Sequence, residues 1–261
     1  MARLESIYRY PVKGLSPEKL PAVRLEAGRT LPADRRYAIE NGPSGFDPTA
    51  PSYLPKTRFL MLMRNERLAT LETRYDDATH VLTIHGEGRE LARGDLSTRE
   101  GRLAIEAFFR RFMPKELMGP PKVLQADDHS FSDVSAKVVS IINLASVAAV
   151  ETLVDAPVHP LRFRANLYVD GWPAWHEFDL LGHEIAIGDA RLKITKRIMR
   201  CAATNVDPDT GLRDLQIPVT LTRNLDHADC GIYARVTTPG EIAPGADVLV
   251  LDKPDASLGI R

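Results

Sequence analysis

The segment that ends in Cys201 holds the residue types in this chain that are best suited to chemistry. Five of the ten residues before the cysteine are basic, namely Arg191, Lys193, Lys196, Arg197 and Arg200. Nearby cations stabilise a thiolate and make a cysteine a better nucleophile or metal ligand. The run Asp207-Pro208-Asp209-Thr210-Gly211 forms turns readily, so we expect Cys201 to stand at the end of a strand, just before the chain reverses.

These residue types leave the role of Cys201 open. A soft thiolate suits copper, zinc or an iron–sulfur iron, whereas an inert thiol beside a solvated strand edge is the plain alternative. The only other cysteine, Cys230, is expected to be a buried structural thiol. The seven histidines are scattered, and the sequence holds no zinc-ligand spacing, P-loop, nucleophile elbow or HExxH motif. The pattern therefore predicts a reactive or metal-ligating cysteine without choosing between them.

Composition narrows the class of protein. The chain has 261 residues, 44% hydrophobic and 26% charged, with a formal net charge of −1. Such a balance argues against a nucleic-acid partner, because nucleic-acid binders carry a basic excess. The N-terminus lacks the apolar core of a signal peptide, and polar residues interrupt the longest apolar stretch, 138–150. With only two cysteines, we expect a cytoplasmic protein without a membrane partner.

The elements that must position these residues are predicted to be mainly β. Nineteen prolines and seventeen glycines suit a fold with many turns. Leu4, Ser6, Tyr8 and Tyr10 alternate along the first predicted strand and are expected to share one side. Similar short apolar or alternating runs predict further strands at RRYAIE, HVLTIHG, EIAIG, RLKITK, GIYARV and DVLVLD. The fold class is therefore mainly β with a few helices (α+β).

Two helices interrupt this β pattern. Ser97 and Glu100 have the spacing of a capping box, which predicts a helix that begins there and stops at Pro114. Its expected apolar stripe is Leu103, Ala104, Ala107, Phe108, Arg111 and Phe112. A second helix is expected over 146–154, after a strand over 138–142.

A proline- and glycine-rich segment divides the chain. Pro114, Gly119, Pro120 and Pro121 mark a boundary, so we expect one domain over 1–120 and another over 121–254. Segment 41–56 holds four prolines and little apolar periodicity, which predicts a long surface loop. Loops of this length often act as binding loops or lids, although plain flexibility is commoner.

Four motifs resemble one protein family. R-C-A-A-T-N-V-D-P-D-T-G, together with Arg162-Phe163-Arg164-Ala165-Asn166, resembles the MOSC family, whose domains are related to the C-terminal part of molybdenum cofactor sulfurases. Tyr10-Pro11-Val12-Lys13-Gly14 and Ala33-Asp34-Arg35-Arg36-Tyr37 resemble the β-barrel domain that precedes MOSC in amidoxime-reducing components and their bacterial relatives. The motifs occur in the family's order, and the resemblance runs from about Arg3 to Leu251.

The resemblance implies a fold and a cofactor. The fold is a MOSC β-barrel preceded by a smaller N-terminal β-barrel-like domain. Cys201 would be the catalytic residue and the ligand of molybdenum in a molybdenum cofactor (Mo-molybdopterin), and pyridoxal phosphate would not be required. The positions matched to the cofactor site are Lys13, Gly14, Arg35, Arg164, Asn166, Met199, Arg200 and Cys201. An Arg guanidinium offers a planar fork to the pterin phosphate, and Lys offers a point charge.

Two of these assignments have rivals in neighbouring residues. Arg36 competes with Arg35, because alternation along a strand turns only one of them inward. Arg162 competes with Arg164, because on a strand the two would share one side. The stretch 135–137 aligns poorly with the family and is left unassigned.

The activity that the resemblance implies is reduction of small N-hydroxylated or N-oxide compounds by a molybdenum-dependent oxidoreductase. The substrate would sit in a shallow cleft between the two lobes, covered by loop 41–56. Because the chain has no cysteines for a cluster, electrons would come from an external iron–sulfur, flavin or haem protein. One alternative is a non-catalytic molybdenum cofactor carrier or sulfur-transfer protein, and another is a β-rich protein without a cofactor.

Overall fold

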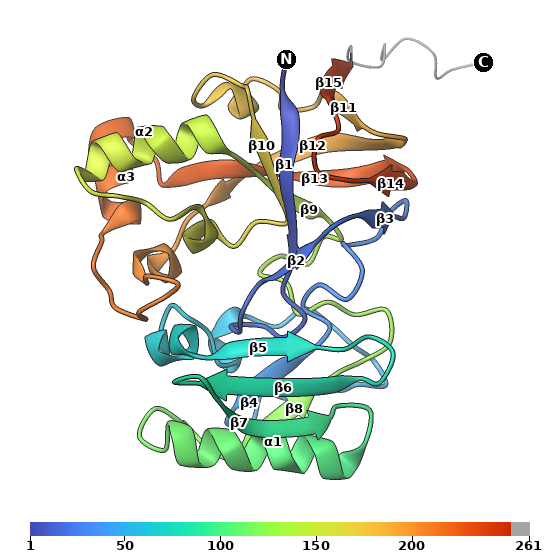
Figure 1. Ribbon diagram of the computed structural model, residues 1–261, viewed down its shortest axis with the longest axis vertical. Coiled ribbons are helices and arrows are strands. Elements are labelled where there is room, and N and C mark those ends of the chain that lie inside the picture. The colour runs from blue at the N-terminus through green and yellow to red at the C-terminus, as the bar shows by residue number, and fades with distance from the viewer. Residues whose placement is uncertain (252–261) are drawn as a thin grey trace.

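The structure, a computed structural model, describes residues 1–251 and has an upper and a lower lobe (Figure 1). One curled sheet of eight strands dominates the upper lobe, in the order β15-β11-β12-β13-β9-β10-β1-β2. Its strands are β1 (Arg3–Arg9), β2 (Glu18–Leu20), β9 (Val139–Asn143), β10 (Leu167–Asp170), β11 (Glu184–Ile187), β12 (Ala190–Met199), β13 (Asp229–Thr238) and β15 (Val248–Leu251).

The first strand, β1, lies between β10 and the edge strand β2 of this sheet. β1 pairs antiparallel with β10, which in turn runs parallel to β9. The register of β1 shifts between Leu4 and Ser6, and such a bulge reverses the side to which later residues point. Leu4 and Ile7 are both fully buried in the same core. The expectation that Leu4, Ser6 and Tyr8 share one side is therefore wrong, because alternation alone cannot reveal a bulge.

Both faces of the large sheet are covered in part by apolar residues. Inside the curl, β-branched and leucine side chains such as Val139, Leu192 and Ile194 form the main core. On the opposite face, α2 (Leu144–Val154) and α3 (Ile217–Leu225) pack over Ile142 and Tyr168. A two-stranded sheet of β3 (Val23–Leu25) and β14 (Gly240–Ile242) completes the upper lobe.

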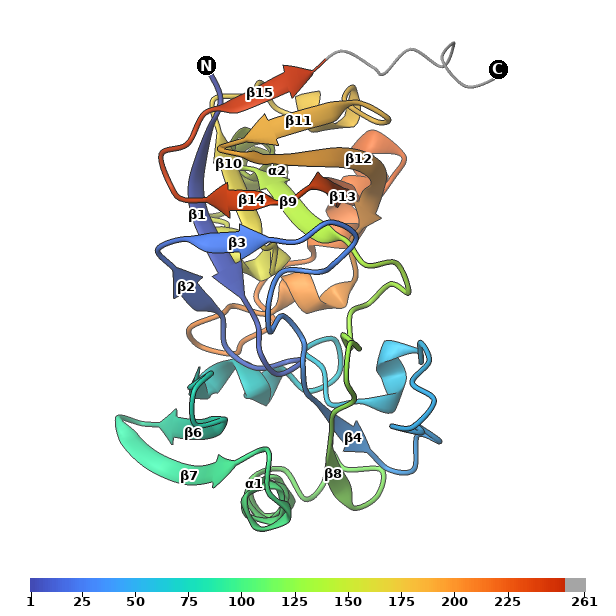
Figure 2. The same cartoon turned by 90° about the vertical axis from the view of Figure 1, so that its right-hand side faces the viewer.

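The lower lobe is built from two small sheets and one helix (Figure 2). β5 (Glu72–Tyr75), β6 (Val81–Gly86) and β7 (Arg89–Asp95) form one antiparallel sheet, and β4 (Ala38–Asn41) pairs with β8 (Pro121–Leu124) in the other. Helix α1 (Arg99–Phe112) contacts β7 and β8. The segment from β8 to β9 climbs from this lobe into the upper one (Figure 2).

Helix α1 begins and packs differently from its prediction. The capping side chain is Thr98, whose Oγ1 accepts a hydrogen bond from Gly101 N at 3.1 Å. The buried stripe contains Ile105, Phe108 and Phe109, whereas Leu103 is 45% exposed. The observed stripe shares Phe108 with the predicted one but is centred on Ile105 and Phe109, so the helix is rotated about its axis relative to the prediction.

The fold class is confirmed as mainly β with helices, since residues 1–251 contain three α-helices and fifteen strands. The domain limits 1–120 and 121–254 stay a prediction, and residues 252–254 of the second lie outside the described part. β1 and β2 share a sheet with the later strands, while β8 pairs in the lower lobe. Among the described residues, no helix is long and apolar enough to cross a bilayer.

Short 3₁₀ helices occupy several of the connections between strands. They are η1 (Lys56–Arg58), η2 (Glu66–Thr70), η3 (Pro160–Phe163), η4 (His176–Phe178) and η5 (Ala202–Asn205). Three of them lie beside the cavity described next, because η1, η3 and η5 each contribute lining residues to it.

Candidate functional site

A cavity of about 350 Å³ brings together residues from both lobes. The N-terminal part of the chain contributes residues 13–14, 34–35, 56 and 61–63, and the later part contributes residues 132–134, 162–164, 166, 196–201 and 203–204 among others. This volume lies in the range of small-ligand sites. All eight residues matched from the sequence line it, namely Lys13, Gly14, Arg35, Arg164, Asn166, Met199, Arg200 and Cys201. We call this space the Cys201 cavity.

Cys201 lies two residues after the end of β12, as its sequence context predicts. It is the residue that caps η5, and its carbonyl accepts a hydrogen bond from Thr204 N at 3.0 Å. The turn that follows is held by the Asp207 carboxylate, which accepts from the backbone N–H groups of Asp209 and Thr210. The thiol is partly exposed, and Lys56 Nζ lies 3.2 Å from its Sγ. The sulfur therefore faces the cavity beside a cation.

Arg200 is clamped in the wall of the Cys201 cavity. Its Nε donates to Cys230 O at 2.6 Å and its Nη1 to Phe163 O at 2.8 Å. Its Nη2 is buried and has no hydrogen-bond partner within the described chain. Gly231 makes room for it, because a Cβ there would lie 2.8 Å from Nη2, and φ is +80°. A buried guanidinium N–H without a partner is costly, so the wall is suited to an anionic acceptor.

Arg35 and Arg164 form a second part of the wall. Both have a φ of 50°, which is unusual for residues with a side chain. Their guanidinium carbons lie 4.4 and 4.2 Å from the centre of the Tyr10 ring. Arg35 donates to Asp34 at 2.5 Å and to Arg164 O at 2.9 Å, and Arg164 donates to Leu15 O at 2.8 Å. Left-handed backbone at two adjacent cations is the kind of strain that gathers at binding sites.

The two arginines differ in electrostatics. Burial lowers the pKa of Arg164 to about 10, and repulsion from Arg35 adds to that effect. For Arg35, burial acts in the same direction, but Asp34, Tyr10 and Asp133 together outweigh it and raise the pKa. Within residues 1–251, Arg164 donates to one carbonyl and lies over one ring but forms no ion pair with an acid, so its charge is available to a ligand.

Both rival arginines have other partners. Arg36 lines a different hollow, and its guanidinium carbon lies 5.8 Å from the Tyr37 ring centre. Arg162 lies in η3 rather than on a strand, so the expectation that it shares a strand face with Arg164 is wrong. Proline at 160 favours a helical turn here, and Arg164 ends it in the left-handed region. Arg162 borders the Cys201 cavity, but its guanidinium is bound by two carboxylates, Asp207 at 2.9 Å and Asp214 at 2.7 Å.

Lys13 and Lys56 are joined by one carboxylate that the sequence did not reveal. Buried Lys13 donates to Phe131 O at 2.8 Å and to the Asp133 carboxylate. Lys56 reaches the other carboxylate oxygen at 3.1 Å. Burial lowers the pKa of Lys13. Burial opposes ionisation of Asp133, but the two lysines outweigh it and hold its pKa well below the usual range.

The remaining predicted residues are Gly14, Asn166 and Met199, and the first two have roles in the fold itself. Gly14 has a φ of +84°, and a Cβ would lie 3.0 Å from the backbone oxygen of Leu60. Asn166 ties three strands together, because its Oδ1 accepts from the N–H of Ser140 at 3.1 Å and its Nδ2 donates to Tyr8 O at 3.2 Å. Met199 is 76% exposed at the cavity's edge. Contact of these residues with a cofactor stays a prediction.

Sequence reasoning missed Lys56, Asp133 and Tyr233. Lys56 ends the predicted loop 41–56, and Asp133 precedes the stretch that was left unassigned. Their contacts join residues 120 and 145 positions apart, so no local pattern could have found them. Tyr233 lies opposite Lys196 and Ser140 in the sheet register. All three line the Cys201 cavity.

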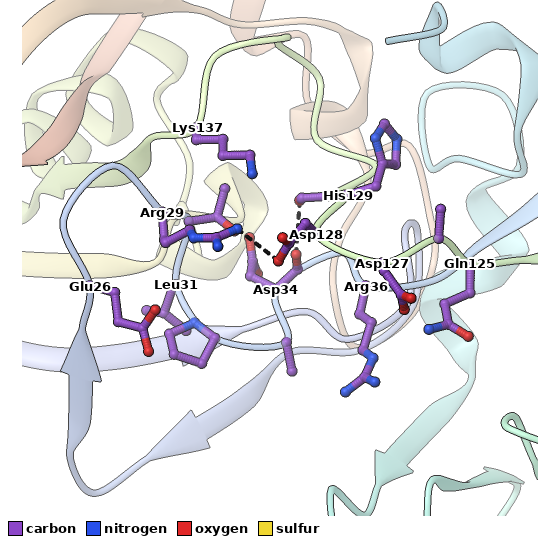
Figure 3. Close-up of a pocket in the computed structure, with 15 residues that line it drawn as sticks. Glu26, Arg29, Leu31, Asp34, Arg36, Gln125, Asp127, Asp128, His129 and Lys137 are labelled. Carbon is purple, nitrogen blue, oxygen red and sulfur yellow. Dashed lines mark hydrogen bonds and ion pairs between the residues drawn. The ribbon is translucent and has the colours of Figure 1, made fainter. Parts of the chain in front are cut away.

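A second hollow, of about 520 Å³, lies next to this one and shares Asp34 with it. Figure 3 shows Lys137 and Arg29 reaching toward it from opposite loops, with Asp128 beside Arg29. Arg29 and Asp128 form an ion pair at 2.7 Å. Acidic residues line this hollow together with the basic ones, so the opposite charges of its walls offset one another. The Cys201 cavity differs because several of its cations, such as Arg164 and Arg200, form no ion pair with an acid of residues 1–251.

The ligand chemistry of the Cys201 cavity follows from these contacts. Within residues 1–251, no group of three or more His, Cys, Asp or Glu side chains gathers as a metal-binding set. A metal at Cys201 would therefore need most of its ligands from a bound molecule rather than from the described chain. The cations Arg164 and Arg200 favour a molecule that carries negative charge.

Two protein-family models together match most of the chain. Residues 1–111 match the MOSC N-terminal beta barrel domain, and residues 126–249 match the MOSC domain. The chain therefore belongs to the proteins in which a MOSC N-terminal beta barrel precedes a MOSC domain. MOSC domains are associated with the molybdenum cofactor.

The curated relatives are mitochondrial amidoxime-reducing components. The chain is 27% identical over 209 residues to mitochondrial amidoxime-reducing component 1 of Homo sapiens, a match that covers 70% of this chain and 60% of the relative. Component 2 of Rattus norvegicus is 32% identical over 40% of this chain and 30% of its own length. The chain thus spans less than two-thirds of these relatives and is distantly related to them. Among solved structures, the YUAD protein from Bacillus subtilis is similar over 95% of this chain and 94% of its own, with 12% identity and a TM-score of 0.44.

Proposed function

We propose that this chain is a molybdenum-cofactor-dependent oxidoreductase that reduces small N-hydroxylated or N-oxide compounds. The observation that supports it is the position of Cys201, at a strand end in a cavity walled by Lys13, Arg35, Arg164 and Arg200. The distant relation to amidoxime-reducing components supports the type of reaction. When bound, the cofactor would supply the two-electron chemistry that removes oxygen from the substrate.

The residues present fit this cofactor. Cys201 offers a soft sulfur to the metal. The unpartnered Nη2 of Arg200 and the guanidinium of Arg164 would hold phosphate or other anionic groups, since an arginine fork suits phosphate. Lys13 would add a point charge. Tyr233 and Ser140, which lie opposite each other on neighbouring strands, would form the floor.

Lys56 has a separate role in the proposal. Burial lowers the pKa of its ammonium, but Asp133 and Cys201 outweigh this and raise it. The group therefore keeps a proton at Nζ beside the sulfur. It would also hold loop 41–56 at the mouth, together with Tyr53, whose hydroxyl donates to Asp133 O at 3.2 Å. Met199 would present an apolar rim to the body of the substrate.

Electrons are proposed to come from a separate redox protein, and the compartment is expected to be cytoplasmic. The second candidate function is a carrier of the molybdenum cofactor or of sulfur. The partial exposure of Cys201 favours it, because an open thiol allows a bound group to be handed on. A carrier would transfer its cofactor to an apo-enzyme and would show no reductase activity with an artificial electron donor.

The decisive experiment compares Cys201→Ser with the wild type after expression in a host that makes the cofactor. We expect molybdenum, measured by elemental analysis, to fall to background and reduction of a benzamidoxime probe by dithionite-reduced methyl viologen to disappear. The matched control is Cys230→Ala, which removes the buried thiol and should keep the metal. Molybdenum in Cys201→Ser at the wild-type level would refute the proposal.

A further inference from the structure

The exposed cations before Cys201 lie on one face of the large sheet. Arg191, Lys193 and Lys196 are exposed on β12, and Arg235 is exposed on the neighbouring β13. The buried residues between them, Leu192 and Ile194, point into the core. β12 and β13 lie side by side in the upper lobe (Figure 2). We call Arg191, Lys193, Lys196 and Arg235 the basic strip.

The basic strip places like charges together. Lys193 and Arg235 are direct partners in the strand register, and like charges in this position destabilise a sheet. None of the four side chains forms an ion pair within residues 1–251. Glu184, opposite Lys193 on β11, and Asp229, opposite Met199, are the acids on β11, β12 and β13. The strip therefore carries a local excess of positive charge that no ion pair within residues 1–251 neutralises.

The strip leads to the mouth of the Cys201 cavity. Lys196 and Met199 line that cavity, and Met199 is 76% exposed. From Lys196 to Arg191 the strand extends roughly 17 Å at about 3.3 Å per residue. An exposed apolar side chain beside a row of free cations is the composition of a protein-binding surface, with a charged region that steers the partner.

We propose that the basic strip docks a small acidic electron-transfer protein, which places its redox centre at the Met199 edge of the Cys201 cavity. This inference rests on the proposed function. Charge complementarity selects an acidic partner. A nucleic acid suits the surface less well, because the chain carries a net charge of −1 and the strip is confined to two strands.

Binding is tested without the cofactor, on the full-length chain. The probe is an acidic plant-type [2Fe–2S] ferredoxin, titrated by calorimetry into the wild type and into the double variant Lys193→Glu/Arg235→Glu. We expect the variant to bind at least about tenfold more weakly, and wild-type binding to weaken similarly from about 20 to about 200 mM salt. The matched control is Arg110→Glu/Arg111→Glu, which reverses two exposed cations on α1 in the lower lobe and should bind like the wild type.

Three results would overturn the docking proposal: no ferredoxin binding, equal affinity of the strip variant, or tighter binding of a single-stranded RNA probe that the strip variant abolishes. Failure of the proposed function has a different signature. In that case viologen-driven reduction of the benzamidoxime probe is absent in the wild type itself. If both proposals hold, the strip variant keeps viologen-driven activity and loses ferredoxin-driven activity.

Discussion

Arg162 and the pair Arg164 and Arg200 border the same cavity but have opposite surroundings. Arg162 is 2% exposed and is held by the carboxylates of Asp207 and Asp214, forming what we call the Arg162 clasp. Arg164, two positions later, donates to a carbonyl and faces a tyrosine ring. Arg200 likewise has carbonyl partners, and its Nη2 has no hydrogen-bond partner among the residues that the structure describes. An arginine whose charge is neutralised by carboxylates stabilises the fold. An arginine whose partners are carbonyls and rings keeps a net charge that can bind an anionic ligand.

The largest effect on stability is expected from breaking the Arg162 clasp. Arg162→Met removes the cation and leaves two carboxylates facing each other, one of them 44% exposed. We expect a loss of about 3 kcal/mol in the free energy of unfolding, measured by urea denaturation. The metal bound per folded molecule should stay near the wild-type level. A stable variant that has lost its metal would show that Arg162 serves the cavity instead.

For Arg164 in the cavity wall, we expect the opposite result, in which metal content falls and stability changes little. Arg164→Gln should lower molybdenum content about tenfold, because a charged donor to the anionic ligand is lost, while stability changes by only about 1 kcal/mol. Elemental analysis and urea denaturation on the same preparation separate the two quantities. Arg36→Gln is the control, since Arg36 lines the other hollow. Equal metal loss in both variants would contradict the assignment.

Acid should weaken the Arg162 clasp in a defined range of pH. Burial opposes ionisation of Asp207, but hydrogen bonds from Thr210 and the charge of Arg162 outweigh it and lower the pKa. A carboxylate with a lowered folded-state pKa stabilises the fold above its unfolded pKa of about 3.9, and this contribution is lost as pH falls through the folded value. Asp207→Asn should therefore remove part of the loss of stability that the wild type shows below about pH 4. Identical acid unfolding curves would argue against the clasp.

The smallest effect is expected on phosphate affinity when the Asp133 carboxylate, which contacts both Lys13 and Lys56, is neutralised. Asp133→Asn leaves Lys13 and Lys56 without their shared acid, so inorganic phosphate should bind the cofactor-free protein about threefold more tightly. Calorimetry at low salt measures this. Asp128→Asn is the matched control on the same segment, because Asp128 pairs with Arg29 in the other hollow. Tighter phosphate binding in both variants would reflect net charge alone.

Much of this architecture could be predicted from local patterns. The strands over EIAIG, RLKITK and GIYARV occur where alternation places them, and β15 covers the described apolar part of DVLVLD, whose last residue lies outside residues 1–251. Cys230 is fully buried as expected. Burial raises the pKa of the Cys230 thiol to about 12, in keeping with an inert group. Local patterns succeed here because period and turn residues act over a few positions.

The rest depends on contacts between distant residues. The bulge in β1, the register of α1 and the 3₁₀ turn at Pro160 are each set by tertiary packing. The motifs pointed to Lys13, Arg35, Arg164 and Arg200 in the Cys201 cavity, but they could not separate Arg162 from Arg164. That choice is made by Asp207 and Asp214, more than forty positions away. Asp133 has no local signal because its partner Lys13 lies 120 positions away.

The place of β1 in the large sheet has a practical consequence. A fragment that begins near residue 120 would retain β9 and β10 but lose β1. The edge of β10 that pairs with β1 would then be exposed. Exposed edges of this kind recruit other chains. Expression of the later portion by itself should give aggregates, and adding a peptide of residues 1–20 in trans should restore solubility.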